Sequence, residues 1–162
     1  MVFKKQGNIY QFSATIKLPI SLKEAWKFLS DPANLKVITP PYMGFHIKSD
    51  LDSEMYAGQI ISYTVSPLLG LKLNWVTEIS HVNEPFYFVD EQRFGPYSLW
   101  HHKHFLREID NGVEMIDIVH YKLPFSMISN QFHSVLVEPK LKEIFEYRTA
   151  KLIELFGEYD SE

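Results

Sequence analysis

The segment FGPYSLWHHKHFLREI, residues 94–109, places His101, His102 and His104 within four consecutive positions. Its sequence pattern is typical of a β-strand, on which His102 and His104 share one face and His101 takes the other. Imidazole binds transition metals, transfers protons near neutral pH and forms hydrogen bonds. These histidines could therefore hold a metal, perform acid–base chemistry, line a pocket or face water.

A hairpin follows this strand and determines which side chains the histidines meet. Asn-Gly at 111–112 is typical of a two-residue turn between antiparallel strands. If Asp110 pairs with Val113, the register makes His104 a diagonal neighbour of Asp117. The imidazole and the carboxylate are then close enough to form a hydrogen bond.

The two faces of this hairpin differ in charge. One face carries four basic side chains, those of His101, Lys103, Arg107 and Lys122. Because burying such groups is costly, we expect that face to point outward. The opposite face is then concave and carries Trp100, His102, His104, Asp117 and Tyr121.

The residues alone leave four interpretations of the inward histidines open. The first is a hydrogen-bonded network inside a packed core, and the second is the same network fixing the polar end of a ligand. The third is a metal chelate of His102, His104 and Asp117, and the fourth is general acid–base catalysis by His104 and Asp117. Since no further strong ligand is evident, we expect no cofactor and no retained zinc or iron.

The composition narrows the class of protein. The chain has 162 residues, a formal net charge of −4, no cysteine and no run of Lys or Arg. This excludes disulfides and thiolate metal sites, and we expect neither nucleic acid nor an anionic membrane as a partner. The first residues lack the apolar stretch of a signal peptide, and no apolar run is long enough to span a membrane. We therefore expect a cytoplasmic protein without membrane insertion, and its oligomeric state stays open.

Near the start of the chain, a strand pattern at 9–20 precedes a short helix. Ser21 is the expected N-cap of that helix, and Glu24 is its capping-box partner three residues later. Asp31–Pro32 ends the helix, and a second short helical stretch precedes Pro40–Pro41. The first strand is therefore followed by two short helices.

The remainder of the chain is strand-rich and ends in a helical pattern. Strand patterns lie at about 43–49, 58–66, 71–80, 85–94, 98–109 and 113–123. The helical pattern begins after Pro124 and runs to Phe156. This order predicts a single α+β domain over residues 1–162, with a curved seven-stranded antiparallel sheet around a long C-terminal helix.

Three segments, LPISLKEAWKFLSDPANLKVITPPYMGFHI, FVDEQRFGPYSLWHHKHF and LKEIFEYRTAKLIELFG, resemble the SRPBCC superfamily. These are the START-like, birch-pollen-allergen-like helix-grip proteins, and the nearest branch is that of small bacterial ligand-binding proteins. The resemblance implies a seven-stranded sheet around the C-terminal helix, with a largely apolar cavity between them. Members include lipid and hormone carriers, polyketide aromatase/cyclases and interaction modules, so the fold alone does not select an activity.

Arg148 occupies a position at which the final helix is expected to be apolar. At 100° per residue, positions 141–156 form an apolar stripe, and Arg148 falls in its middle. In one interpretation the guanidinium reaches solvent at the helix flank or forms a purely structural ion pair. In the other it enters the cavity and pairs with Asp117, Asp90 or a ligand carboxylate.

Together these patterns favour binding of a small hydrophobic molecule with a polar or acidic end, such as a lipid-like or polyketide-like compound. The expected apolar contacts are Trp75, Trp100, Tyr121 and Phe145. The expected polar anchors are His102, His104, Asp117 and Arg148. Two alternatives remain: a cyclase/dehydratase-type enzyme in which His104 and Asp117 are the acid–base pair, and an interaction module with a filled cavity.

Overall fold

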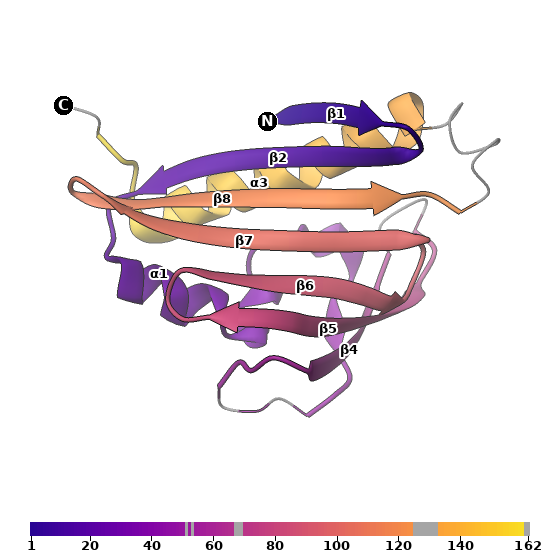
Figure 1. Ribbon diagram of the computed structural model, residues 1–162, viewed down its shortest axis with the longest axis horizontal. Coiled ribbons are helices and arrows are strands. Elements are labelled where there is room, and N and C mark those ends of the chain that lie inside the picture. Colours follow the sequence, from indigo (N-terminus) through magenta and orange to yellow (C-terminus); the bar gives the residue numbers. More distant parts are fainter. Residues whose placement is uncertain (51, 53, 67–69, 125–132, 161–162) are drawn as a thin grey trace.

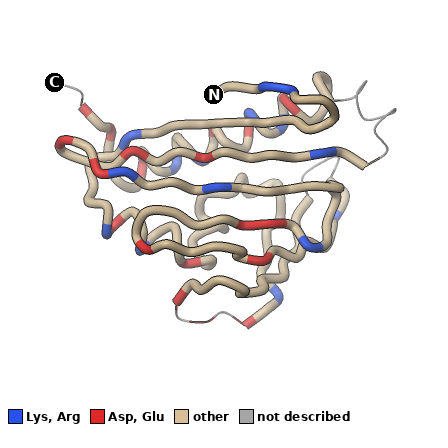
Figure 2. Tube along the Cα trace, viewed as in Figure 1, with Lys and Arg blue, Asp and Glu red and all other residues tan. Residues whose placement is uncertain are grey.

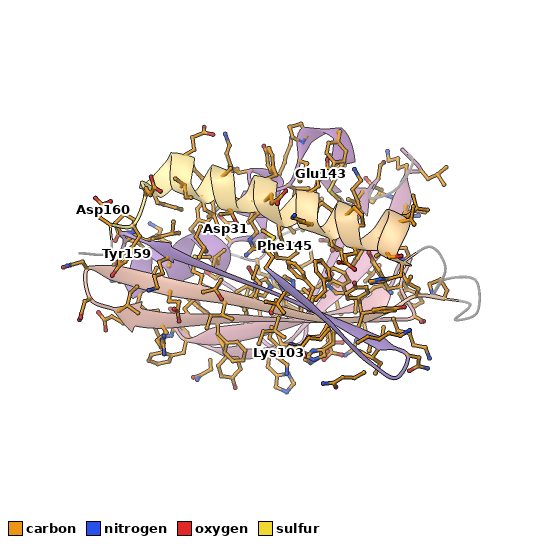
Figure 3. The ribbon with its side chains drawn as sticks, turned by 90° about the horizontal axis from the view of Figure 1, so that it is seen from above. Asp31, Lys103, Glu143, Phe145, Tyr159 and Asp160 are labelled. Atoms are coloured by element: carbon orange, nitrogen blue, oxygen red, sulfur yellow. The ribbon has the colours of Figure 1, made fainter. Side chains whose placement is uncertain are left out.

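The computed structural model describes residues 1–50, 52, 54–66, 70–124 and 133–160. An antiparallel sheet of eight strands forms one layer, in the order β1-β2-β8-β7-β6-β5-β4-β3. The long helix α3 (Glu138–Phe156) lies along one face of this sheet (Figure 1). Figure 3 shows the helix and the sheet as two layers, with side chains filling the space between them.

The strands are β1 (Val2–Gln6), β2 (Ile9–Leu18), β3 (His46–Ile47), β4 (Gln59–Val65), β5 (Leu73–Asn83), β6 (Tyr87–Phe94), β7 (Leu99–Ile109) and β8 (Gly112–Lys122). The helix α1 (Leu22–Leu29) and the 3₁₀ turns η1 (Pro32–Lys36) and η2 (Pro41–Met43) connect β2 to β3. The π-helical turn η3 (His133–Val137) leads into α3.

The α+β class, the antiparallel sheet and the long C-terminal helix are confirmed, but the sheet has eight strands rather than seven. The additional strand is β1, which pairs with β2 at one edge of the sheet. Of its five residues only Phe3 is partly buried. An exposed edge strand needs no alternation of apolar and polar residues, and that alternation is the signal by which strands are read from sequence.

The predicted capping box begins α1. The Ser21 hydroxyl accepts a hydrogen bond from the Glu24 backbone N–H, and the Glu24 carboxylate accepts one from the Ser21 N–H. The second short helix is the 3₁₀ turn η1, which Asp31 caps by accepting from the Ala33 N–H. The predicted start of the final helix after Pro124 falls partly on 125–132, outside the described residues.

The β7–β8 hairpin is shifted by two residues from the register expected from the sequence. Ile109 pairs with Gly112, so Asp110 and Asn111 form the loop, and His104 lies directly opposite Asp117. Asn111 adopts the left-handed φ of 58° that the turn requires, which leaves Gly112 to start the second strand. Because a shift of two residues preserves the alternation, the inward and outward faces are unchanged.

The inward face of the hairpin is buried against α3. His102, His104 and Asp117 are each no more than 7% exposed. On the outward face Lys103 points away from the helix layer, as Figure 3 shows. Basic and acidic residues are spread along several strands and helices of the described chain (Figure 2).

Apolar clusters hold the helix on the sheet at both ends. Near one end of α3, Phe145 packs on Phe12 with their ring centroids 4.5 Å apart. Near the other end, Leu152 belongs to a cluster that includes Trp26 of α1 and Phe88 of β6. Arg148 lies between Phe145 and Leu152 on the same buried stripe of α3.

We predict that Gly112→Ala destabilises the fold by about 1–3 kcal/mol, because the added Cβ would collide with the backbone oxygen of Leu18 on the neighbouring strand β2. Urea denaturation of the wild type and the variant measures the difference. The control is Asn111→Gly, since glycine accepts the φ of 58° and we expect a change within about 0.5 kcal/mol. Equal stabilities of Gly112→Ala and the wild type would show that the sheet tolerates a side chain here.

Candidate functional site

A cavity of about 200 Å³ lies between α3, the short helices and strands β4 to β7. Most of its wall is apolar, with contributions from Leu35, Phe45, Ile61, Trp75, Trp100 and Phe145. The polar part of the wall includes the ionisable side chains of Asp90, His102, His104 and Arg148. The cavity therefore combines a large apolar surface with a compact group of ionisable side chains.

Three adjacent strands bring this polar group together. On β7, His102 and His104 lie between β6, which carries Asp90, and β8, which carries Asp117. The backbone register places Asp90 directly opposite His102, and Asp117 directly opposite His104. Each carboxylate is therefore the direct neighbour of one imidazole and the diagonal neighbour of the other.

The hydrogen bonds follow the diagonals. His104 Nε2 lies 2.8 Å from Asp90 Oδ2, and His102 Nε2 lies 3.0 Å from Asp117 Oδ1. The two imidazole rings lie against each other, with centroids 3.7 Å apart. The sequence predicts a hydrogen bond between His104 and Asp117. The structure brings these two side chains into contact, but the hydrogen bond to Asp117 comes from His102.

Each carboxylate also contacts the histidine directly opposite it, at the second nitrogen of that imidazole ring, Nδ1. His102 Nδ1 lies 3.3 Å from Asp90 Oδ2, and His104 Nδ1 lies 2.8 Å from Asp117 Oδ1. The second contact is short, but its direction does not fit a hydrogen bond, and His104 Nδ1 has no other partner among the described residues. Each carboxylate therefore has an oxygen within 3.3 Å of a nitrogen of both imidazoles.

Arg148 reaches this group from α3. Its Nη2 lies 3.5 Å from Asp117 Oδ1, and only 8% of the residue is exposed. The structure thus gives Arg148 a buried ion pair rather than a route to solvent. Its Nε is buried without a hydrogen-bond partner in the described part of the chain. Arg148 therefore lines the cavity and has one buried donor without a hydrogen-bond partner among the described residues.

Burial and charge shift the pKa values of the carboxylates. Burial alone would raise the pKa of Asp117, but the charge of Arg148 and the contacts with both imidazoles hold it well below its usual range. The pKa of Asp90 is also lowered, because the two histidines outweigh the effect of burial. Both carboxylates are therefore ionised at neutral pH.

The pKa values of the two histidines shift in opposite directions. Burial, followed by the charge on His104, lowers the pKa of His102. Burial acts on His104 too, but its contacts with Asp117 and Asp90 outweigh that effect and raise its pKa. His104 therefore takes up a proton before His102.

The residues expected at the site are divided between the cavity wall and its surroundings. Trp75, Trp100, His102, His104, Phe145 and Arg148 line the cavity. Asp117 lies behind the histidines and borders a much smaller void between β2 and α3. Tyr121 is fully buried elsewhere, where its hydroxyl and His133 Nε2 lie 2.6 Å apart and Tyr10 stacks on the His133 ring.

Asp90 was not among the binding residues expected from the sequence. Its strand was recognised, and alternation places Asp90 on the same face as Phe88. A carboxylate on the inward, apolar face of a strand is the signal that could have identified it, since such a group needs buried partners. The register between β6 and β7, which determines those partners, cannot be read from these two strands separately.

No protein-family model matches the chain, and no curated protein matches it. Solved structures do match over almost the whole length. Protein Ms6760 of Mycobacterium smegmatis is 17% identical, with a TM-score of 0.65 and 96% of each chain covered. A protein from Arthrobacter aurescens is 16% identical, with a TM-score of 0.68 and coverage of 94% of this chain and 91% of that one. The major latex-like protein 151 of Panax ginseng is 11% identical, with a TM-score of 0.68 and coverage of 93% and 99%.

The chain therefore shares its overall fold with these solved structures, an antiparallel sheet lying against a long C-terminal helix, which is the helix-grip arrangement that the sequence resemblance implied. At these identities the likeness establishes the fold and leaves the activity to be argued from the site. None of the helices in the described part of the chain has the length and apolar character that a membrane crossing requires.

We predict that Arg148→Met destabilises the protein by about 3–5 kcal/mol, because Asp117 loses its guanidinium in a buried setting. The matched control is Arg107→Met. Arg107 also pairs with a carboxylate, Glu114, at 2.6 Å, but its side chain is 68% exposed, so we expect a loss of at most about 1 kcal/mol. Thermal and urea denaturation of both variants measure the difference. Equal losses would contradict the assignment of Arg148 as a buried charge partner.

Proposed function

We propose that the protein binds a small hydrophobic molecule with a polar or acidic end in the cavity between the sheet and α3. One observation carries this proposal: a mainly apolar cavity whose wall includes the clustered ionisable side chains of Asp90, His102, His104 and Arg148. Ligand sites of this kind combine apolar surface for affinity with a few polar groups that fix orientation.

The aromatic wall suits the apolar part of such a molecule. Trp75 and Trp100 meet edge to face with their ring centroids 5.4 Å apart, and Tyr97 packs against both. These rings pack against one another, so a ligand would meet a preformed surface. Little conformational entropy of the side chains would then be lost on binding. A cavity of about 200 Å³ suits a small molecule and argues against the alternative of a filled interaction module.

The polar end of the ligand would lie against the histidines and Arg148. The Nε of Arg148 lacks a partner among the described residues, and a ligand oxygen could accept a hydrogen bond from it. His104 is held by Asp90 at 2.8 Å, which fixes the orientation of its ring on the wall. The superfamily resemblance supports this proposal, since its members include carriers of small hydrophobic molecules.

The position of His104 also favours a second candidate, an enzyme of the cyclase/dehydratase kind. His104 lines the cavity with a carboxylate on either side, and these carboxylates raise its pKa. Such an imidazole can exchange a proton with a bound substrate. The two candidates differ in one measurable outcome, because a carried ligand is recovered unchanged after binding and a substrate is not.

We predict that matched compounds with the same hydrocarbon chain, a fatty acid, its alcohol and the parent alkane, separate in affinity, with the acid and the alcohol binding more tightly than the alkane. Binding raises the melting temperature by mass action and changes the fluorescence of Trp75 and Trp100 on the wall. All titrations are done with excess chelator, so that they report on the metal-free protein. Mass spectrometry of the recovered compounds then tests for turnover.

Two neighbouring residues of β4 provide a test of location. Ile61 is buried and lines the cavity, whereas Ile60 points to the other face and is 49% exposed. We expect Ile61→Phe to fill part of the cavity and weaken binding at least about tenfold, a change of about 1.4 kcal/mol. Ile60→Phe should bind like the wild type. Absence of binding by the wild type, or equal binding by both variants, would refute the proposed site.

A further inference from the structure

Asp90, His102 and His104 offer one ligand atom each within a small volume. The three atoms lie within 4.8 Å of one another. Asp90 Oδ2 is close to both imidazoles, 2.8 Å from His104 Nε2 and 3.3 Å from His102 Nδ1. Two ring nitrogens and a carboxylate oxygen therefore converge on the polar part of the cavity wall.

We propose that Asp90, His102 and His104 form a binding site for a divalent transition-metal ion on the cavity wall. Two imidazoles and one carboxylate form a donor set that suits iron(II) and zinc(II). Three protein ligands leave coordination positions open. Since all three residues line the cavity, those positions would face the space in which a small molecule is proposed to bind.

The surroundings of His102 match those of a metal ligand. A histidine bound to a metal through one nitrogen commonly donates its other N–H to a carboxylate, which fixes the ring and its tautomer. His102 Nε2 lies 3.0 Å from Asp117 Oδ1, so Nδ1 is the nitrogen directed toward Asp90. Arg148 in turn holds Asp117 from α3. Asp117 is therefore a positioning residue behind the ligands rather than a ligand itself.

The charge of the wall also favours a cation. The half-buried carboxylate of Asp90 and the buried carboxylate of Asp117 are accompanied by one guanidinium, that of Arg148, which pairs with Asp117. With both imidazoles neutral, as metal binding requires, the group has an excess of negative charge. Binding of a divalent ion would change the net charge of this group from negative to positive. An acidic ligand end would then meet a positive wall, and this last step rests on the proposed function.

This proposal departs from the expectation drawn from the sequence, which was that no metal is retained. That expectation considered Asp117 as the third ligand beside His102 and His104 and found no other. The structure supplies Asp90 in that position and places Asp117 behind the histidines. The change follows from the pairing of β6 with β7, which sets Asp90 opposite His102.

The test is a titration of chelator-stripped protein with Co²⁺, followed by its visible absorption and by calorimetry, with no organic ligand present. We expect one equivalent to bind saturably to the wild type. His102→Ala should abolish this step. The matched control is His101→Ala/His120→Ala, which removes a pair of facing histidines from the outer side of the same hairpin. We expect that control to bind Co²⁺ like the wild type.

Two further variants keep the test independent of folding defects. Asp90→Asn preserves the shape of the side chain and should weaken Co²⁺ binding strongly, while its circular dichroism remains that of the wild type. Asp117→Asn should weaken binding about 10–100-fold, as expected for a group that orients a metal ligand. Absence of a saturable step in the folded wild type would overturn the proposal. So would a step that survives in His102→Ala or that the outer-face control loses.

The metal titration and the fatty-acid series test the two proposals independently, so that either proposal can be refuted while the other stands. Binding of the acid and the alcohol in the presence of chelator, without any Co²⁺ step, would overturn the metal site and leave the proposed function standing. A Co²⁺ step without binding of any compound would do the reverse. If both hold, Co²⁺ should increase the preference for the acid over the alcohol.

Discussion

The crossed hydrogen bonds between two carboxylates and two imidazoles are the constraint on which the centre of this molecule depends. An ionised carboxylate cannot be buried without partners at acceptable free energy, and Asp117 is 6% exposed. Its partners sit on a different strand and on a helix. Asp117 therefore has all its partners only if two conditions hold together. The strand β7 must pair with β8 in the observed register, and α3 must lie at the distance from the sheet that brings Arg148 to Asp117.

This requirement makes the register of three strands a matter of electrostatics as well as of apolar packing. A slip of one residue in β7 would turn both histidines outward and leave the buried Asp117 and the half-buried Asp90 without them. A slip of two would keep the faces but move each imidazole away from its diagonal carboxylate. The apolar clusters at the two ends of α3 would tolerate the second error better than the ionisable group in the middle.

The local features of the fold were readable from the sequence, and the contacts between strands were not. Ser21 and Glu24 lie three residues apart, so their capping box needs no tertiary information. The faces of the hairpin also followed from alternation, even though its register was wrong by two residues. The register depended on whether Asn111 or Gly112 would take the left-handed conformation at the turn, and both residue types accept it. Asp90 shows the same limit, since its partners are defined by a neighbouring strand.

The two outermost strands of the sheet also matter for how the molecule behaves among copies of itself. A sheet edge presents backbone N–H and C=O groups that can recruit a strand from another chain, and proteins counter this with short edges and lysines. Here β3 is two residues long, and β1 has five residues, two of which are Lys4 and Lys5. Both edge strands of the eight-stranded sheet are thus poor templates for pairing with a strand of another chain. The fold protects itself against edge-to-edge aggregation at the positions where its sequence pattern is least strand-like.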